Sequence, residues 1–284
     1  MKQGSLPTDS LVIARLRAAG CVFAEEEAAI LAAQAGTPAE LDAMVERRAG
    51  GEPLEQVVGW AEFAGLRVLV DPGVFVPRRR SEYLVEVAVL LAERQDGAVP
   101  RVIVDLCCGT GALGLAVAVE VAPGVGEASA SVRLRGVELH AADLDPAAVA
   151  CARRNVESAG GHVYAGDLFG ALPDSLRGRI GVLICNAPYV PTTEIAFMPA
   201  EAREHEALMA LDGGTDGLAV LRRVAADAGG WLAPGGVLLV ETSERQAPAM
   251  TAAMTAAGLR GRVHSDDEWG ATVVTGVVGG RFLA

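Results

Sequence analysis

The stretch VIVDLCCGTGALG, which covers residues 102–114, decides the fold of this chain. It begins with a mostly apolar run that predicts a buried strand, and it continues through Gly109 and Gly111 into an alanine-rich helix. Glycines let the backbone come close to a ligand, and the free N–H groups at a helix N-terminus point toward it. The pattern Asp-x-x-x-Gly-x-Gly differs from the pyrophosphate-binding glycine fingerprint. Its acidic residue, Asp105, favours a ligand with an ammonium or sulfonium group.

Strands and helices alternate after this stretch. Apolar runs predict strands at 137–143, 162–165, 181–185 and 237–241, and a closing antiparallel pair at 260–264 and 271–278. The alternation predicts an α/β fold, a Rossmann-like and mostly parallel sheet that ends in an antiparallel hairpin. Ligands of such sheets bind beyond the carboxyl ends of the strands. Residues that follow each strand are therefore the first candidates for a functional site.

Acidic residues after the second and third predicted strands are candidates for holding a nucleoside. Asp143 stands where a carboxylate can accept hydrogen bonds from both ribose hydroxyls, because Asp145 and Pro146 already supply the N-cap and first turn of the next helix. Asp167 can accept a hydrogen bond from an adenine amino group while Leu168 lies on the base. An ordinary surface turn explains Asp167 equally well, and the sequence leaves both interpretations open.

The fourth predicted strand leads into Asn186-Ala187-Pro188-Tyr189. The Asn186 side-chain oxygen and the Ala187 carbonyl can each accept one hydrogen from a planar nitrogen, and Tyr189 can stack on its plane. An ordinary strand exit with an Asx-type turn is the alternative, and the four residues alone favour it. The candidate residues named so far nevertheless end successive strands, one per strand. Their shared location favours a functional site.

The N-terminal residues predict a separate small region. Residues 1–56 contain three helical patterns, and Thr37 with Pro38 predicts the start of the third. Strand-like residues at 57–70, with Gly65 at the bend, predict a β-hairpin. We therefore expect a helical domain at 1–56, a hairpin linker at 57–80 and an α/β domain with the candidate functional site at 81–284.

Three arginines, Arg78 to Arg80, precede Ser81, which we expect to cap the helix that begins near Glu82. In an acidic chain such a cluster is either a solvated helix start or a contact for an acidic group of cofactor or substrate. The sequence does not separate these two interpretations.

Composition argues against several classes of function. The net charge of −12 and the pI of about 4.8 argue against nucleic acid as a direct substrate. The five cysteines and four histidines form no metal-binding pattern, so we expect no metal site. Unpaired cysteines fit a reducing cytoplasm, no apolar run is long enough to span a bilayer, and residues 1–5 lead into no signal-peptide core. We expect a cytoplasmic monomer that binds no membrane.

Together these motifs resemble the class I S-adenosylmethionine-dependent methyltransferases, and more narrowly the protein-glutamine methyltransferases that modify peptide chain release factors. The resemblance covers nearly the whole chain. It is carried by Gly51-Glu52-Pro53-Leu54, Gly59 with Phe63 and Gly65, Val76-Pro77-Arg78 with Glu82, Asp105 to Gly111, Asp143, Gly166 to Phe169, Asn186 to Tyr189, and Glu206 with Gly213-Gly214 and Asp216 to Leu218.

The resemblance implies that S-adenosylmethionine is the cofactor and that a glutamine side-chain amide of a protein is methylated, such as the Gly-Gly-Gln motif of a release factor. It implies cofactor contacts from Asp105, Cys107, Cys108, Gly109, Thr110, Gly111, Asp143, Asp167, Leu168 and Asn186. The implied catalytic and substrate-binding residues are Asn186, Ala187, Pro188 and Tyr189, and Arg78 is implied to bind substrate.

Three departures from the family pattern point to a related subgroup whose protein target can differ. Ala187 replaces the first proline of Asn-Pro-Pro-Tyr, Cys107 replaces the first glycine of the cofactor loop, and Pro-Arg-Pro-Glu-Thr-Glu appears as Pro-Arg-Arg-Arg-Ser-Glu at 77–82. Three alternatives remain open: methylation of adenine or guanine amino groups in nucleic acid, methylation of a small molecule, and cofactor binding without catalysis. The acidic pI argues against the first, and an intact Asn186 and Tyr189 argue against the last.

Overall fold

The computed structural model of the chain describes residues 10–95, 99–122 and 134–279. Residues 1–5, considered above for a signal peptide, lie outside these ranges. Within the described ranges, no helix is both long enough and apolar enough to cross a membrane.

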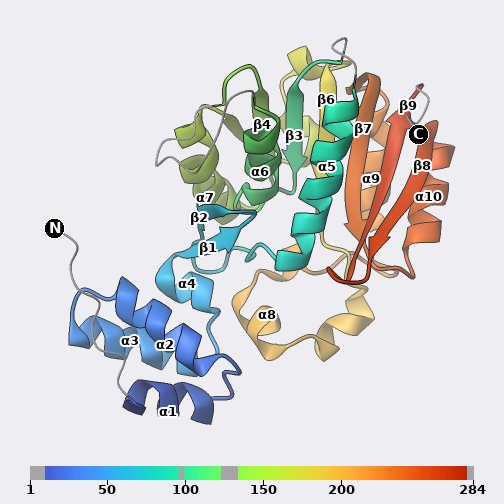
Figure 1. Cartoon of the computed structure of the whole chain (residues 1–284). Helices are drawn as coiled ribbons and strands as arrows, with labels where there is room; N and C mark the ends of the chain where they lie inside the picture. Colours follow the sequence, from blue (N-terminus) through green and yellow to red (C-terminus); the bar gives the residue numbers. More distant parts are fainter. Residues whose placement is uncertain (1–9, 96–98, 123–133, 280–284) are drawn as a thin grey trace.

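Helices make up the N-terminal part of the molecule (Figure 1). They are α1 (Ser10–Ala18), α2 (Ala24–Gln34), α3 (Pro38–Ala49) and α4 (Leu54–Val58). These helices share an apolar core that includes the buried side chains of Leu16, Leu31 and Val45. The Thr37 hydroxyl accepts a hydrogen bond from the Glu40 N–H at 3.2 Å, so the predicted start of α3 is confirmed.

The sequence does not predict α4. This helix takes up Val57 and Val58, which the strand pattern assigns to the hairpin, and it ends at Gly59, whose φ is +82°. A helix of five residues is too short to display a helical apolar period. The hairpin that follows is shorter than expected, with β1 (Trp60–Phe63) antiparallel to β2 (Leu66–Leu69).

A second sheet forms the centre of the molecule, with the strand order β5-β4-β3-β6-β7-β9-β8. Its parallel strands are β3 (Val102–Leu106), β4 (Glu138–Asp143), β5 (His162–Ala165), β6 (Ile180–Cys185) and β7 (Leu232–Thr242). Strand β9 (Ala271–Val278) pairs antiparallel with both β7 and β8 (Leu259–Asp266). The predicted α/β fold with a closing antiparallel hairpin is therefore confirmed. Strand order reverses between β3 and β6, which is where sheets of this kind bind ligands.

Helices cover both faces of this sheet. Helices α5 (Glu82–Arg94), α6 (Ala112–Val121) and α7 (Pro146–Val156) lie on one face, and α9 (Ala219–Ala228) and α10 (Ala247–Ala256) lie on the other. Alternate strand residues pack against them, so that Ile103 faces the first group while Val102 and Val104 face the second. Because both faces are buried, the strands are largely apolar and the polar groups gather at their ends.

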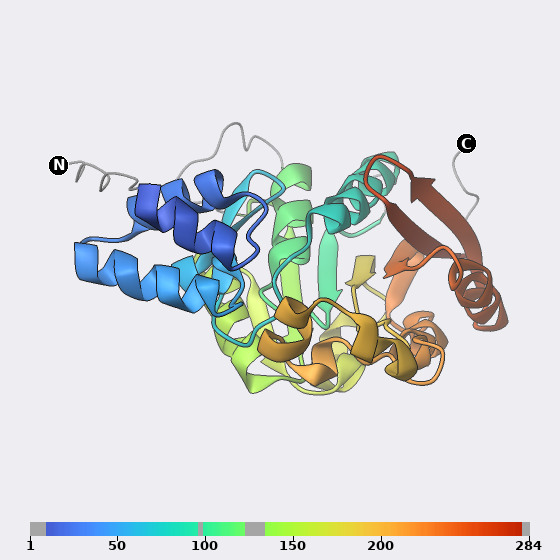
Figure 2. The same cartoon turned by 90° about the horizontal axis from the view of Figure 1, so that it is seen from below.

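The carboxyl end of the sheet is covered by residues 191–212, which we call the cover segment. It contains short 3-10 turns at Thr192–Phe197 and Leu208–Ala210 and helix α8 (Ala200–His205). Figure 2 shows this segment from below, lying across the end of the sheet beside the N-terminal helices. Single bridges fix it in place, joining Gly73 to Glu206 and Val190 to Asp212.

Candidate active site

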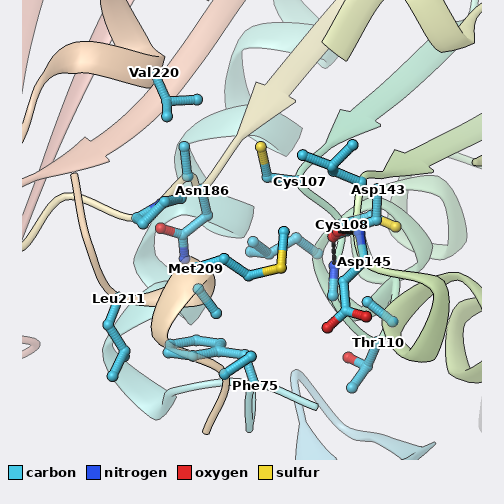
Figure 3. A pocket seen from close by; sticks show the side chains of 18 of the residues that line it. Phe75, Cys107, Cys108, Thr110, Asp143, Asp145, Asn186, Met209, Leu211 and Val220 are labelled. Atoms are coloured by element: carbon cyan, nitrogen blue, oxygen red, sulfur yellow. Dashed lines mark hydrogen bonds between the residues drawn. The ribbon is translucent and has the colours of Figure 1, made fainter. Parts of the chain in front are cut away.

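A cavity lies at the carboxyl ends of the parallel strands, beneath the cover segment. Asn186 and Asp143 project into it from opposite sides, and Met209 reaches between them (Figure 3). We call the side built after β3, β4 and β5 the cofactor half, and the side around Asn186 the acceptor half. The cavity brings together these predicted residues: Arg78, Cys107, Cys108, Gly109, Thr110, Asp143, Asp167, Leu168, Asn186, Ala187, Pro188 and Tyr189.

Asp143 is fixed by backbone donors at the end of β4. The Gly109 N–H donates to its Oδ2 at 2.8 Å, and the Asp145 N–H donates to its Oδ1 at 2.9 Å. Asp145 in turn caps α7 by accepting from the Ala147 N–H at 2.8 Å, as the sequence predicts. Burial raises the pKa of Asp143. Each of its oxygens keeps a second lone pair, so this carboxylate can accept two more hydroxyl donors.

Asp167 and Leu168 follow β5 and line the same side. The Asp167 Oδ2 accepts a hydrogen bond at 2.6 Å from Nη2 of Arg223, a residue of α9 that the sequence analysis did not place near the site. Leu168 has a φ of +48°, a conformation that costs energy for a side-chain-bearing residue and is often found where a ligand binds. Asp167 is thus held at the cavity wall by a residue from a distant part of the sequence.

Asp105 and Gly111 lie behind the cavity wall. Asp105 is fully buried; its Oδ2 accepts from the Gly114 N–H at 2.9 Å, and its Oδ1 has no partner among the described residues. Burial raises the pKa of Asp105 to about 7. A Cβ at Gly111 would lie 2.6 Å from Val156, so this glycine allows α6 and α7 to pack closely. Both residues support the glycine-rich loop from beneath.

The cofactor half fits S-adenosylmethionine. Asp143 offers acceptors for ribose hydroxyls, and the apolar side chains of Ala142, Leu144 and Leu168 line the wall where a base can lie. A Cβ at Gly109 would meet no atom within 4 Å, so the cavity has room beside this loop. Within the described ranges, no group of three or more His, Cys, Asp or Glu could hold a metal ion.

The acceptor half is organised around the Asn186 amide. Its Nδ2 donates to Ser81 Oγ at 3.3 Å and to Glu241 Oε2 at 3.4 Å. No residue that the structure describes donates to its Oδ1, and the side chain lines the cavity. The Ala187 carbonyl likewise accepts no backbone hydrogen bond from the described residues. Two unused acceptors therefore follow one another at the end of β6.

Tyr189 is held by an ionic pair. Its hydroxyl donates to Glu241 Oε1 at 2.8 Å and accepts from Arg80 Nη2 at 2.7 Å. The Arg80 Nε also donates to Glu241 Oε1, at 3.1 Å. Burial raises the pKa of Tyr189 well above its ordinary value, so its hydroxyl stays protonated. The Tyr189 carbonyl accepts from Gln246 Nε2 at 2.8 Å, which fixes the backbone as well.

Ser81, Arg80 and Glu241 were not predicted as site residues. The prediction that Ser81 caps α5 is wrong: its backbone is already helical, its side chain makes no capping bond, and its hydroxyl accepts from Asn186 instead. The sequence could have indicated Glu241 as a site residue, because it is an acid at the carboxyl end of a parallel strand, as Asp143 is. The sequence left open that the cluster from Arg78 to Arg80 contacts an acidic group of cofactor or substrate; the acidic group that Arg80 contacts is Glu241 of the chain itself.

Arg78 lines the cavity but is occupied by Glu206 of the cover segment. Its Nη2 lies 2.6 Å from both carboxylate oxygens, and the Val76 N–H donates to Glu206 Oε1 at 3.2 Å. Burial raises the pKa of Glu206. The acidic group that Arg78 contacts therefore belongs to the chain itself, and the pair ties the segment before α5 to the cover segment.

The chain is similar in sequence to proteins of known function. Residues 65–257 match the family described as methyltransferase small domain. The chain is 39% identical to a release factor glutamine methyltransferase of Streptomyces coelicolor, over 72% of this chain and 67% of that protein. It is 34% identical to the release factor glutamine methyltransferase of Geobacter sulfurreducens, over 86% of this chain and 80% of that protein.

Other relatives differ in what they act on. A 4-amino-L-phenylalanine/4-methylamino-L-phenylalanine methyltransferase of Streptomyces pristinaespiralis is 35% identical, over 75% of this chain and 69% of that protein. Among solved structures, a 16S rRNA N2 G1207 methyltransferase of T. thermophilus in complex with AdoMet and guanosine aligns with a TM-score of 0.50 and 19% identity, over 77% of this chain and 49% of that one. The latter similarity shows the fold alone.

Proposed function

The chain belongs to the methyltransferase small domain family and, within it, to the release factor glutamine methyltransferases, and from this premise we propose that it methylates a glutamine side-chain amide of a protein. The methyl donor is S-adenosylmethionine. The target in this proposal is the Gly-Gly-Gln motif of a release factor or a related protein. We propose that the enzyme acts as a cytoplasmic monomer, with residues 1–56 as a platform for the protein substrate, 57–80 as the linker and 81–284 as the catalytic domain.

The pair of unused acceptors beside the cofactor half carries this proposal. A primary amide nitrogen has two hydrogens in one plane, and Asn186 Oδ1 and the Ala187 carbonyl offer one acceptor for each. The Tyr189 ring lines the same part of the cavity, and its hydroxyl is held by Arg80 and Glu241. Substitution of proline by Ala187 leaves the backbone carbonyl unchanged, so the acceptor pair does not depend on that proline.

An amide nitrogen is a poor nucleophile because its lone pair is delocalised into the carbonyl. S-adenosylmethionine supplies an electrophilic methyl group on a sulfonium; the C–S bond breaks, a C–N bond forms, and one amide proton leaves to solvent. The protein's part is to hold both hydrogens, so that the nitrogen faces the donor; such positioning is worth roughly 7–11 kcal/mol of barrier. The Asn186 and Ala187 carbonyl dipoles would also stabilise positive charge that develops on the nitrogen.

The experiment uses the purified protein, S-adenosylmethionine and a peptide that contains Gly-Gly-Gln, with matched Gly-Gly-Glu and Gly-Gly-Asn peptides as controls. We expect one added methyl group on the glutamine peptide only, located on the side chain by tandem mass spectrometry. Methylation of the glutamate peptide, or of none of the three, would contradict the proposal.

A small-molecule amine is the second candidate acceptor. It is favoured by the 35% identity to the 4-amino-L-phenylalanine/4-methylamino-L-phenylalanine methyltransferase of Streptomyces pristinaespiralis. A parallel assay with 4-amino-L-phenylalanine separates the two candidates. Turnover of the amino acid without turnover of the peptide would show that the acceptor is a free amine and not a protein glutamine.

A further inference from the structure

Glu241 is a nearly buried carboxylate at the end of β7 that contacts the main residues of the acceptor half. Only 3% of its side chain is exposed. Its Oε1 accepts from the Tyr189 hydroxyl and from Arg80 Nε, at 2.8 and 3.1 Å, and its Oε2 accepts from Asn186 Nδ2 at 3.4 Å.

An asparagine amide can present either its oxygen or its NH2 group to a ligand. A carboxylate can only accept hydrogen bonds. If the Asn186 amide were flipped, its oxygen would face Glu241 Oε2, and its NH2 group would face the acceptor nitrogen, which also carries hydrogens. Glu241 therefore permits only the orientation in which Asn186 Oδ1 is turned toward the cavity.

Arg80 fixes Glu241 in place. A buried carboxylate without a partner is costly, and the Arg80 Nε and the Tyr189 hydroxyl together hold one of its oxygens. The other oxygen is then left for Asn186. In the family pattern an acid stands at position 80, so this ion pair is a feature of the present chain.

We propose that Glu241, fixed by Arg80, is a positioning residue that locks the Asn186 amide with its oxygen toward the acceptor nitrogen. The proposal rests on the proposed function, because an oxygen is required there only if the acceptor donates hydrogens. Ser81 contributes to the same orientation, since its hydroxyl oxygen accepts a hydrogen bond from the Asn186 Nδ2 at 3.3 Å.

The substitution Glu241→Gln tests this proposal sharply. Arg80 would still donate to the side-chain oxygen of the new glutamine. The glutamine NH2 group would then face Asn186 and favour the flipped orientation of the Asn186 amide. We expect kcat to fall about tenfold to a hundredfold, with the Kd for S-adenosylmethionine within about twofold of the wild-type value, as expected when only positioning is lost. Glu138→Gln is the matched control, because Glu138 pairs with Arg179 at the same distance of 3.1 Å at the opposite end of the sheet.

A second variant distinguishes positioning from general damage. Asn186→Asp alone sets two carboxylates against each other and should lose activity. In Asn186→Asp with Glu241→Gln, the glutamine NH2 donates to the aspartate, whose other oxygen again faces the acceptor. We expect the double variant to exceed the kcat of either single variant by at least about tenfold. A double variant no faster than the slower single variant, or wild-type kcat in Glu241→Gln, would overturn the proposal.

A measurement without turnover separates this proposal from the proposed function. The Asn186 side-chain NH2 signals, identified by NMR as the pair missing in Asn186→Asp, should be protected from solvent exchange in the wild type and lose that protection in Glu241→Gln. Unchanged signals would overturn the lock even if the glutamine peptide is methylated. If protection is lost in Glu241→Gln but the wild type methylates no glutamine peptide, the positioning role of Glu241 is supported and the proposed glutamine acceptor is rejected.

Discussion

The cofactor half and the acceptor half of the cavity are built in different ways. In the cofactor half, Asp143 is held by two backbone N–H groups, those of Gly109, 34 residues away, and of Asp145, two residues away. In the acceptor half, side chains hold one another across long sequence separations, such as 161 residues between Arg80 and Glu241. Asp143 of the first half therefore depends on backbone donors, whereas the second half depends on side chains that meet only in the completed fold. We therefore expect mutations to affect the two halves separately.

Replacing Asn186 by alanine should have the largest effect and should be confined to the acceptor half. The loss of one oriented dipole at the reacting nitrogen is expected to lower kcat about a thousandfold. The Kd for S-adenosylmethionine, measured by calorimetry, should change by less than about threefold. Comparable losses of turnover and cofactor affinity would show that the two halves are not separable.

Replacing Asp105 by asparagine tests the support beneath the cofactor half. The folded protein holds the Asp105 proton more tightly than the unfolded chain, because burial raises its pKa from 3.8 to about 7. The stabilisation from this proton is complete below about pH 4 and is lost as the pH rises toward 7. Asparagine does not titrate, so the stability of Asp105→Asn relative to the wild type should rise over this window by about 4 kcal/mol and should not rise further above it.

Chemical denaturation of both proteins from pH 4 to pH 8 measures this difference. A stability difference that does not vary with pH would mean that Asp105 is not the titrating group. Asp174→Ala is a suitable control for general charge effects, since Asp174 is well exposed and lies outside the cavity.

Replacing Asp143 by alanine should affect the cofactor half alone. Loss of the carboxylate that can accept from two hydroxyls should raise the Kd for S-adenosylmethionine by about a hundredfold or more, since hydrogen bonds to charged groups contribute about 1.5–3 kcal/mol each. At saturating cofactor, kcat should stay within about threefold of the wild-type value. A large loss of kcat at saturation would place Asp143 in the acceptor chemistry instead.

Replacing Arg223 by alanine should have the smallest effect. Its pair with Asp167 is exposed, and such pairs contribute about 0–1 kcal/mol. The Kd for S-adenosylmethionine should rise by less than about fivefold. Arg222→Ala is the matched control, because Arg222 pairs with Asp216 at the same 2.6 Å outside the cavity. A loss of binding as large as that of Asp143→Ala would make the Asp167–Arg223 pair part of the cofactor site proper.

The same contrast explains what the sequence could predict. The strand pattern and the acids and glycines at strand ends are local, so the sheet, its closing hairpin and the location of Asp143 and Asn186 at one edge followed from them. Helix α4 did not, because a short helix with valines resembles a strand. The contacts of Ser81 and Arg80 did not either, because they join segments that only the finished fold brings together.

The measurement that tests the central claim most directly is localisation of the transferred methyl group. A full-length release factor and a bacterial lysate are incubated separately with the protein and isotopically labelled S-adenosylmethionine, and labelled peptides are sequenced by tandem mass spectrometry. The account predicts label on the side-chain amide of a glutamine in a protein, present with the wild type and absent with Asn186→Ala. Label on nucleic acid, on a non-amide group, or at equal levels with Asn186→Ala would contradict it.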